Sequence, residues 1–256
     1  MAHVLNAYAL PESVRPDELA GGTVVVIDVL RASTTIVHAL EAGATEVIPC
    51  QEVDEARAVA ARLPRGGVIL GGERRGLPIQ GFDLGNSPEE YLPSRVAGKT
   101  VVFTTTNGTR AIFHARQAQR VLIGAFINAS AVLDQLLRQE QIHLLCAGTR
   151  GQLSRDDVLL AGMLVDRILR QGDPSYQQNA QAVAAREAWL RCLPLPRAPE
   201  AELPQPQQLA EQLRDSAGGR NLIAIGLDDD ILAAAQIDRF RSVPEMDPER
   251  DRIRLP

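Results

Sequence analysis

Four short segments of the sequence gather the residue types that could bind an anion or a metal ion. Each combines glycines, hydroxyls or arginines with at least one carboxylate or amide, and each follows an apolar run. They span residues 28–35, 71–88, 104–110 and 147–157. Carboxylates can hold a cation, whereas hydroxyls, backbone amides and arginines can donate hydrogen bonds to a phosphate or another acid. Together the four segments predict a site for a small anionic molecule.

The first and third segments are typical of a phosphate-binding turn at the start of a helix. Their candidate residues are Asp28, Arg31, Ser33, Thr34, Thr105, Thr106, Asn107, Gly108 and Thr109. Free N–H groups at a helix start attract anions, and the hydroxyls add further donors. The third segment lacks the GK[ST] ending of a Walker A loop. Structural interpretations stay open, because Ser33 can be a simple N-cap, Asp28 can complete a turn, and threonines favour strands.

The second and fourth segments add glycines and charge. Their candidate residues are Glu73, Arg74, Asp83, Asn86, Gly148, Thr149, Arg150, Asp156 and Asp157. Glycines beside charged residues let the backbone approach a ligand closely, and such a polar connection is uncommon as a plain loop. In the structural alternative, residues 86–88 form an ordinary turn before a helix and the paired aspartates only suit a helix dipole.

Three acidic residues, Asp28, Glu73 and Asp157, are expected to converge with these groups at one edge of a sheet. Hard oxygen ligands without histidine or cysteine favour Mg²⁺ over zinc. The histidines fall within expected helices, within a strand or near the N-terminus, and are interpreted as structural: His3, His38, His114 and His143.

Strands and helices alternate along the first 170 residues. Apolar, β-branched runs predict strands at 23–30, 46–50, 67–72, 100–105, 121–126 and 142–147. Helical patterns follow at 33–42, 52–63, 109–117, 129–139 and 154–170. Short connections between them predict a largely parallel sheet with helices on its faces, an α/β fold in a single domain over residues 1–256. Ligands of such sheets bind at the carboxyl ends of the strands.

Two of these strand–loop–helix units resemble each other. Residues 25–27 and 36–39 align with residues 101–103 and 112–115 at a constant offset, and both units carry polar residues between strand and helix. The pattern indicates two similar halves.

The C-terminal third does not continue the regular alternation of predicted strands and helices. Residues 177–191 predict an amphipathic helix, and the proline-rich stretch at about 192–208 predicts an extended surface connection. The apolar run 221–226 predicts one more strand, and 228–235 predicts a helix. The charged residues 248–256 are expected to be peripheral or frayed.

Composition excludes several classes of protein. Of the 256 residues, 45% are hydrophobic and 23% charged, which is typical of a globular domain. The net charge of −5 gives no basic field for nucleic acid or an anionic membrane. The three cysteines form no CxxC pair, so neither a disulfide framework nor a zinc site is expected. Without a visible signal peptide or an apolar run long enough to span a bilayer, a cytoplasmic location is expected.

Six motifs, in order, resemble the 2-phosphosulfolactate phosphatases over nearly the whole chain. They are DVLRASTT (28–35), GGERRG (71–76), GFDLGNSP (81–88), TTTNGT (104–109), AGTRGQLSRDD (147–157) and DDDILAAAQIDRFRSVP (228–244). The resemblance implies a three-layer α/β/α fold. It also implies Mg²⁺-dependent removal of phosphate from (R)-2-phospho-3-sulfolactate, which gives 3-sulfolactate on a route to coenzyme M.

The resemblance also suggests roles for the candidate residues. Asp28, Glu73 and Asp157 would hold Mg²⁺, and Asp83 or Asp157 would act as general base for the attacking water. The substrate would be bound by Arg31, Ser33, Thr34, Arg74, Asn86, Thr105, Thr106, Asn107, Gly108, Thr109, Gly148, Thr149 and Arg150. The alternative is a non-catalytic sensor for a small phosphorylated or sulfonated acid. A homodimer is plausible for either.

Overall fold

One mixed sheet forms the centre of the molecule. The computed structural model describes residues 3–64, 66–171, 175–192 and 203–256. Within these residues the sheet has 11 strands in the order β5-β4-β6-β3-β11-β10-β7-β2-β8-β1-β9. The strands are β1 (Val4–Tyr8), β2 (Thr23–Ile27), β3 (Glu46–Pro49), β4 (Val68–Arg74), β5 (Leu77–Pro78), β6 (Thr100–Thr104), β7 (Arg120–Gly124), β8 (Gln141–Cys146), β9 (Gln177–Gln178), β10 (Glu245–Asp247) and β11 (Arg252–Arg254). The six strands expected in residues 23–147 are all present.

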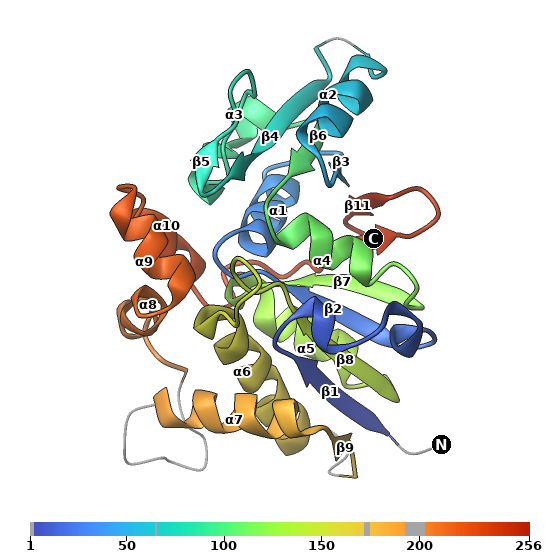
Figure 1. Cartoon of the computed structure of the whole chain (residues 1–256), viewed down its shortest axis with the longest axis vertical. Coiled ribbons are helices and arrows are strands. Elements are labelled where there is room, and N and C mark those ends of the chain that lie inside the picture. The colour runs from blue at the N-terminus through green and yellow to red at the C-terminus, as the bar shows by residue number, and fades with distance from the viewer. Residues whose placement is uncertain (1–2, 65, 172–174, 193–202) are drawn as a thin grey trace.

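The sheet consists of two parallel blocks. Strands β4, β6 and β3 form the first block, and β7, β2, β8, β1 and β9 form the second. Each block contains one of the two similar strand–loop–helix units, because β6 leads into α4 and β2 leads into α1. The first block occupies the upper part of Figure 1 and the second the lower part.

The hairpin β10–β11 joins the two blocks and is antiparallel to both. Strand β11 pairs antiparallel with β3, and β10 pairs antiparallel with β7. Three successive reversals mean that the blocks run in opposite directions, so their loops do not share a single edge of one parallel sheet. The expectation of one common edge is therefore wrong, although loops of both blocks still meet at one pocket, as described below.

The expectation that residues 248–256 are peripheral holds for the exposed Glu249 and Arg250 but is wrong for residues 252–254. Ile253 is fully buried, and Arg252 and Arg254 both form ion pairs with the buried carboxylate of Glu46 on β3. The charges that suggested a solvated tail are partners for an interior acid. Residues 252–254 are thus a central strand of the sheet.

Helices cover both faces of the sheet, as expected for three layers. They are α1 (Ala32–Glu41), α2 (Val53–Ala61), α3 (Pro93–Val96), α4 (Gly108–His114), α5 (Ala129–Leu136), α6 (Arg155–Gln171), α7 (Ala180–Cys192), α8 (Pro206–Arg214), α9 (Ala217–Ala224) and α10 (Asp229–Ala234). Strand β2 shows the layering, because Val25 packs in the cluster formed with α5 and α6, whereas Val24 and Val26 pack in the cluster formed with α1 and α4. Both faces of β2 are therefore buried, which explains its continuous apolar run.

The C-terminal helices α8, α9 and α10 form a cluster beside the sheet (Figure 1). The strand expected at residues 221–226 is wrong, since this run lies mostly in α9. Ser216 caps α9 by accepting a hydrogen bond from the N–H of Gly219 (2.8 Å), and one side of the helix is exposed at Ile223 while Leu222 is buried. A short apolar run has no periodicity that separates a strand from a helix.

Other C-terminal expectations have mixed outcomes. The helix expected at 177–191 begins at Ala180, after the short strand β9, and Asn179 caps it by accepting a hydrogen bond from the N–H of Ala182 (2.8 Å). The helix expected at 228–235 is α10. Of the proline-rich connection, residues 193–202 lie outside the described residues, and Pro206 already belongs to α8. No helix in the described part of the chain has the length and apolar character needed to cross a membrane.

Candidate functional site

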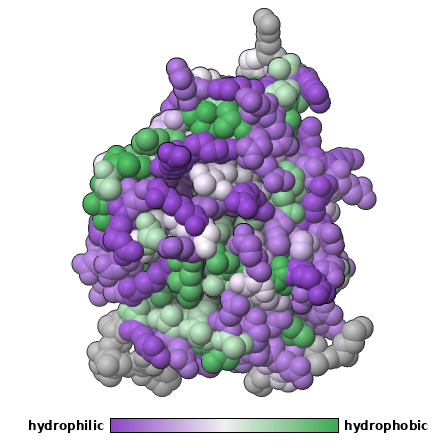
Figure 2. Space-filling view, viewed as in Figure 1, coloured by the Kyte–Doolittle hydropathy of each residue, from purple (hydrophilic) through white to green (hydrophobic). Residues whose placement is uncertain are grey.

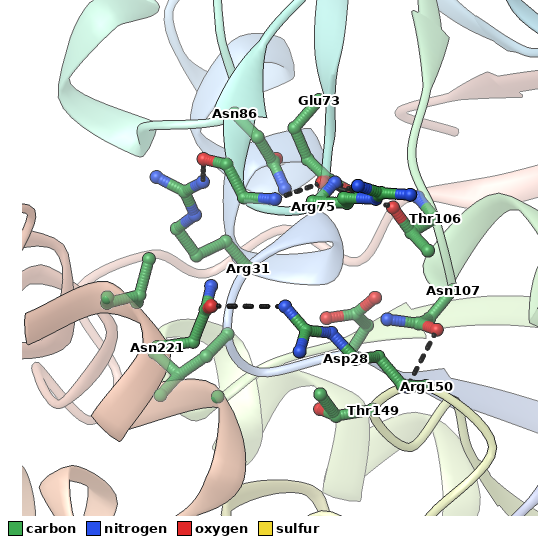
Figure 3. A pocket seen from close by; sticks show the side chains of 14 residues that line it. Asp28, Arg31, Glu73, Arg75, Asn86, Thr106, Asn107, Thr149, Arg150 and Asn221 are labelled. Carbon is green, nitrogen blue, oxygen red and sulfur yellow. Dashed lines mark hydrogen bonds between the residues drawn. The ribbon is translucent and has the colours of Figure 1, made fainter. Parts of the chain in front are cut away.

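Loops from both sheet blocks line one pocket (Figure 3). Its lining residues follow β2, β4, β6 and β8, with additions from the segment after β5 and from α9: Asp28, Leu30, Arg31, Glu73, Arg75, Gly76, Asn86, Thr106, Asn107, Thr149, Arg150, Gly218, Asn221 and Leu222. Hydrophilic side chains surround the middle of this face of the molecule, and hydrophobic side chains gather below it (Figure 2). Eight of the candidate residues predicted from sequence therefore meet here: Asp28, Arg31, Glu73, Asn86, Thr106, Asn107, Thr149 and Arg150.

Asp28 is the buried carboxylate of the pocket. It directly follows β2, is 7% exposed, and accepts a hydrogen bond from the N–H of Ala32 (3.3 Å). The loop after β6 reaches it because residue 108 is glycine. A Cβ atom there would lie 2.6 Å from Oδ2 of Asp28 and 2.4 Å from Cβ of Ala32.

Burial and neighbouring acids raise the pKa of Asp28 to about 7. The largest cause is the loss of hydration on burial, followed by the negative charge of Asp156 and, to a lesser extent, that of Glu73. The hydrogen bond from Ala32 and the positive charge of Arg31 act in the opposite direction and lower the pKa. A carboxyl group with such a pKa in a pocket is a candidate for a functional role.

Asp157 and Asp156 support the pocket from behind. Asp157 is 1% exposed, and its two oxygens accept hydrogen bonds from the N–H groups of Val29 (2.8 Å) and Gly148 (3.0 Å). Burial, followed by the charges of Asp156 and Asp28, raises the pKa of Asp157 well above its usual value. Burial also raises the pKa of Asp156. These two carboxylates fix the loops after β2 and β8, and neither lines the pocket.

Glu73 ties the two loops of the first block together. Its Oε1 accepts a hydrogen bond from the N–H of Thr106 (2.6 Å), and its Oε2 accepts one from the N–H of Gly76 (2.6 Å). The Thr106 hydroxyl adds a third hydrogen bond to Oε2 (3.2 Å). Both oxygens of Glu73 therefore have partners in the protein.

The hydroxyls expected to hold a phosphate are mostly used inside the protein. Ser33 donates to the carbonyl of Val26 (3.2 Å), and Thr34 donates to that of Val29 (2.7 Å). Thr109 donates to the carbonyl of Thr105 (3.0 Å), and the Thr105 hydroxyl accepts the N–H of Thr109 (3.2 Å). Ser33, Thr34, Thr105, Gly108 and Thr109 are not among the residues that line the pocket.

Two further candidates lie apart from the pocket or behind it. Asp83 is exposed, and its carboxylate accepts the N–H of Leu70 (2.8 Å). Gly148 has a left-handed backbone (φ 66°) and donates its N–H to Asp157, so it shapes the loop after β8. As an exposed residue away from the pocket, Asp83 is poorly placed to be the general base.

The four arginines near the pocket differ in their partners. Arg31 forms a buried ion pair with Asp230 of α10 (2.5 Å) and also donates to the carbonyl of Gly76 (2.9 Å). Arg74 turns away from the pocket and donates to the carbonyl of Gln51 and the hydroxyl of Thr104 (both 2.9 Å). Arg75 and Arg150 line the pocket, and no acidic side chain in the described part of the chain lies within ion-pair distance of either.

Sequence reasoning does not identify Arg75 as a pocket residue and points to the neighbouring Arg74 instead. The wall formed by Gly218, Asn221 and Leu222 was missed as well, because residues 221–226 were expected to form a strand. The GGERRG motif contained both arginines, and nothing in its composition separates them. The only sequence signal for α9 was the capping serine ahead of two glycines.

The pocket offers few oxygen ligands for a metal ion such as Mg²⁺. No group of three or more histidine, cysteine, aspartate or glutamate side chains in the described residues is arranged to hold a metal ion, so Asp28, Glu73 and Asp157 do not form a ready three-carboxylate site. However, the buried Oδ1 of Asn86 has no hydrogen-bond partner and Asn86 lines the pocket together with Asp28. Mg²⁺ commonly keeps several waters and takes one or two protein oxygens plus phosphate. The carboxylate of Asp28 and the amide oxygen of Asn86 are oxygen donors of the type that such binding uses.

The fold and the pocket define a class of protein: an α/β protein with a site for a small acid, in which a buried carboxylate lies among unpaired arginines and amide side chains. The description "2-phosphosulpholactate phosphatase" belongs to the family profile that matches residues 8–249. The chain belongs to this family.

Similar proteins cover nearly the whole chain. A protein of Symbiobacterium thermophilum is 41% identical over 229 residues, which are 89% of this chain and 92% of the relative. A protein of Deinococcus radiodurans is 40% identical over 251 residues, 96% of this chain and 95% of the relative. Both are named probable 2-phosphosulfolactate phosphatases. The resemblance expected from the six motifs is confirmed.

Proposed function

We propose that the protein hydrolyses the phosphate ester of 2-phospho-3-sulfolactate in a Mg²⁺-dependent reaction. The observation that carries the proposal is the juxtaposition of Asp28, a buried carboxylate with a pKa of about 7, with arginines that have no acidic partner. Family membership supplies the substrate and the reaction type.

Asp28 and Oδ1 of Asn86 are the groups that would hold Mg²⁺. When bound, the ion would neutralise charge on the phosphoryl oxygens. Asn107, on the loop after β6, lies where its side-chain amide can orient the phosphoryl group, whereas the neighbouring Thr106 hydroxyl already donates to Glu73. Asp156 and Asp157 hold the loops around Asp28 in place, and the raised pKa values of this acidic group are consistent with a site that takes up a cation.

Phosphate release from 2-phospho-3-sulfolactate tests the proposal. Purified protein treated with EDTA is compared with the same protein after addition of Mg²⁺, and phospholactate and phosphoglycerate serve as comparison substrates. We expect release only with Mg²⁺ and a preference for the sulfonated compound. Failure to release phosphate from all three compounds would favour the sensor interpretation.

A pair of matched variants tests the role of Asp28. Asp28→Asn removes the charge of the pocket carboxylate, and we expect it to lower kcat by roughly a hundredfold or more, as for loss of a group that stabilises the transition state. Asp83→Asn makes the same chemical change at an exposed position and should leave kcat unchanged. Equal activity of the two variants would contradict the assignment of Asp28.

Two expectations about the protein in the cell are part of the proposal. We expect a cytoplasmic protein and a homodimer that acts on a small anionic metabolite. The class of substrate is supported by the pocket and the family, and sedimentation velocity with the purified chain would test the dimer.

A further inference from the structure

The two arginines that face the pocket share an unusual backbone. Arg75 has a φ of 57° and Arg150 a φ of 54°, and among the described residues only Asp238 and Asp251 are other non-glycine residues with positive φ. This left-handed conformation is unfavourable for residues other than glycine, and it concentrates at functional sites. Glycine would occupy both positions without strain, so the presence of arginine at both positions indicates that the side chains have a function.

The side chains of Arg75 and Arg150 are free to accept an acid. In the described part of the chain, the Arg150 guanidinium donates to Oδ1 of Asn221 (3.4 Å), and its backbone N–H donates to Oδ1 of Asn107 (3.3 Å). The backbone N–H of Arg75 lies 3.4 Å from the Thr106 hydroxyl. An arginine without an acidic partner beside a pocket is a ready ligand for carboxylate, sulfonate or phosphate.

The guanidinium groups of Arg31 and Arg74 already have partners within the protein. The guanidinium of Arg31 is neutralised by Asp230, which also accepts a hydrogen bond from the Ser87 hydroxyl (2.5 Å). Arg74 donates hydrogen bonds to two backbone carbonyls and to the Thr104 hydroxyl, outside the pocket. A substrate acid could recruit Arg31 only by competing with a buried carboxylate.

The two free arginines approach from different sheet blocks. Arg75 follows β4 and lies with Glu73 and Thr106 on one side of the pocket, whereas Arg150 follows β8 and lies with Asn107 and Thr149 on the other side (Figure 3). Asp28 lies between the two loops. A ligand bound at Asp28 would therefore have one guanidinium available on each side.

We propose that Arg75 and Arg150, and not Arg31 or Arg74, bind the acid groups of the substrate. The pocket then selects small phosphate esters that carry at least one further acid group, and it discriminates against a phosphate ester of the same size that carries none. This inference rests on the proposed function, which it deepens by naming the residues that set specificity.

Glutamine variants test the proposal through KM and substrate preference. Arg75→Gln and Arg150→Gln are compared with wild type on 2-phospho-3-sulfolactate and on isopropyl phosphate. The latter is the phosphate monoester of a secondary alcohol and carries no further acid group. We expect KM for the first compound to rise roughly 10- to 100-fold in each variant, as for loss of a charged hydrogen bond, and the preference over isopropyl phosphate to shrink. Arg110→Gln removes one exposed positive charge from α4, outside this pocket, and should leave KM unchanged.

Glycine variants separate binding from a structural role. Because the left-handed backbone suits glycine, Arg75→Gly and Arg150→Gly should unfold at the same temperature as wild type or at a higher one, while KM rises as in the glutamine variants. Wild-type KM in both pairs of variants would overturn the proposal. So would a lowered unfolding temperature combined with an unchanged substrate preference.

A binding measurement keeps this inference distinct from the proposed function. Isothermal titration calorimetry with 3-sulfolactate, the expected product, needs no turnover. If wild type binds the product but releases no phosphate from any ester, the proposed function fails, whereas weaker product binding by both glutamine variants would still support the arginine assignment. Equal binding by wild type and both variants would refute that assignment whether or not the protein is an enzyme.

Discussion

The ion pair between Arg31 and Asp230 is expected to be a strong determinant of stability. Both side chains are almost fully buried, 3% and 4% exposed, and the two charged atoms lie 2.5 Å apart. The change Asp230→Asn keeps the shape of the side chain and leaves the guanidinium of Arg31 buried without a counter-charge. Removing one partner of a buried pair costs about 3–5 kcal/mol. For a protein of this size, that is a fall in Tm of roughly 6–20 °C.

Urea unfolding followed by circular dichroism measures this loss, and the chain offers a matched control. Asp228, two residues earlier, pairs with Arg214 at 2.8 Å, but the side chains are 46% and 35% exposed. Asp228→Asn should therefore cost only about 0–1 kcal/mol, because water screens the exposed pair. Equal losses in the two variants would refute the argument from burial.

A double variant shows how much of the lost stability of Asp230→Asn comes from the unpaired, buried charge of Arg31. Arg31→Met combined with Asp230→Leu removes both charges and fills similar volume. We expect it to be more stable than Asp230→Asn, since replacing a whole buried pair by apolar groups is often nearly neutral. A double variant that is less stable than the single one would show that the hydrogen bonds of Arg31 to Gly76 and of Ser87 to Asp230 matter more than the charges.

Three further predictions follow from the structure. Asp28 has a pKa of about 7 in the folded protein and about 4 when unfolded, so the folded state binds more protons between these values. Its contribution to the stability of the metal-free protein is therefore greatest at low pH and is lost as pH rises toward 7. The pH profiles of Tm for wild type and Asp28→Asn should diverge in this window. Identical profiles would contradict the assignment. Gly108→Ala places Cβ 2.4 Å from Ala32 and should cost about 1–3 kcal/mol and most of the activity, whereas Gly67→Ala, with no contact closer than 3.6 Å, should cost much less in urea unfolding. Ile253→Ala, at a fully buried position of β11, should cost about 2–5 kcal/mol in the same assay, and a loss below 1 kcal/mol would support a peripheral C-terminus.

The strands and helices of residues 23–171 could be predicted because their apolar residues follow clear periods. Val24–Ile27 is β-branched and buried on both faces, and α6 is a long helix whose middle, residues 159–166, is buried on all sides. Within each block, the grouping of the polar loops could be predicted from their positions after parallel strands. That much of the candidate site depends only on the order of the elements.

The opposite direction of the two sheet blocks could not be predicted. It depends on β10 and β11, which have only three residues each and one buried apolar side chain each, Met246 and Ile253. Their arginines are attracted to Glu46, a partner about 200 residues earlier in the chain. A pattern of neighbouring residues carries no information about such a partner.

The choice between Arg74 and Arg75 was equally beyond the sequence. Adjacent residues of one strand end point in different directions, and the left-handed backbone of Arg75 decides which side chain lines the pocket. Asp28 differs from Asp157 for a similar reason. Both are buried aspartates, Asp28 directly after β2 and Asp157 in the first turn of α6, but backbone N–H groups occupy both oxygens of Asp157.

The position of the hairpin β10–β11 has a consequence for the order of events during synthesis. Residues 245–254 leave the ribosome after every strand that they connect, yet they pair with β3 and β7 and so determine how the two blocks face each other. The strands of the first block lie together in the sequence, within residues 46–104, whereas β1 and β2 of the second block must wait for β7 and β8, and the pocket needs loops from both blocks. A nascent chain therefore holds no complete binding site until these last strands have inserted, and an incomplete chain released early would present two half-sites with exposed sheet edges.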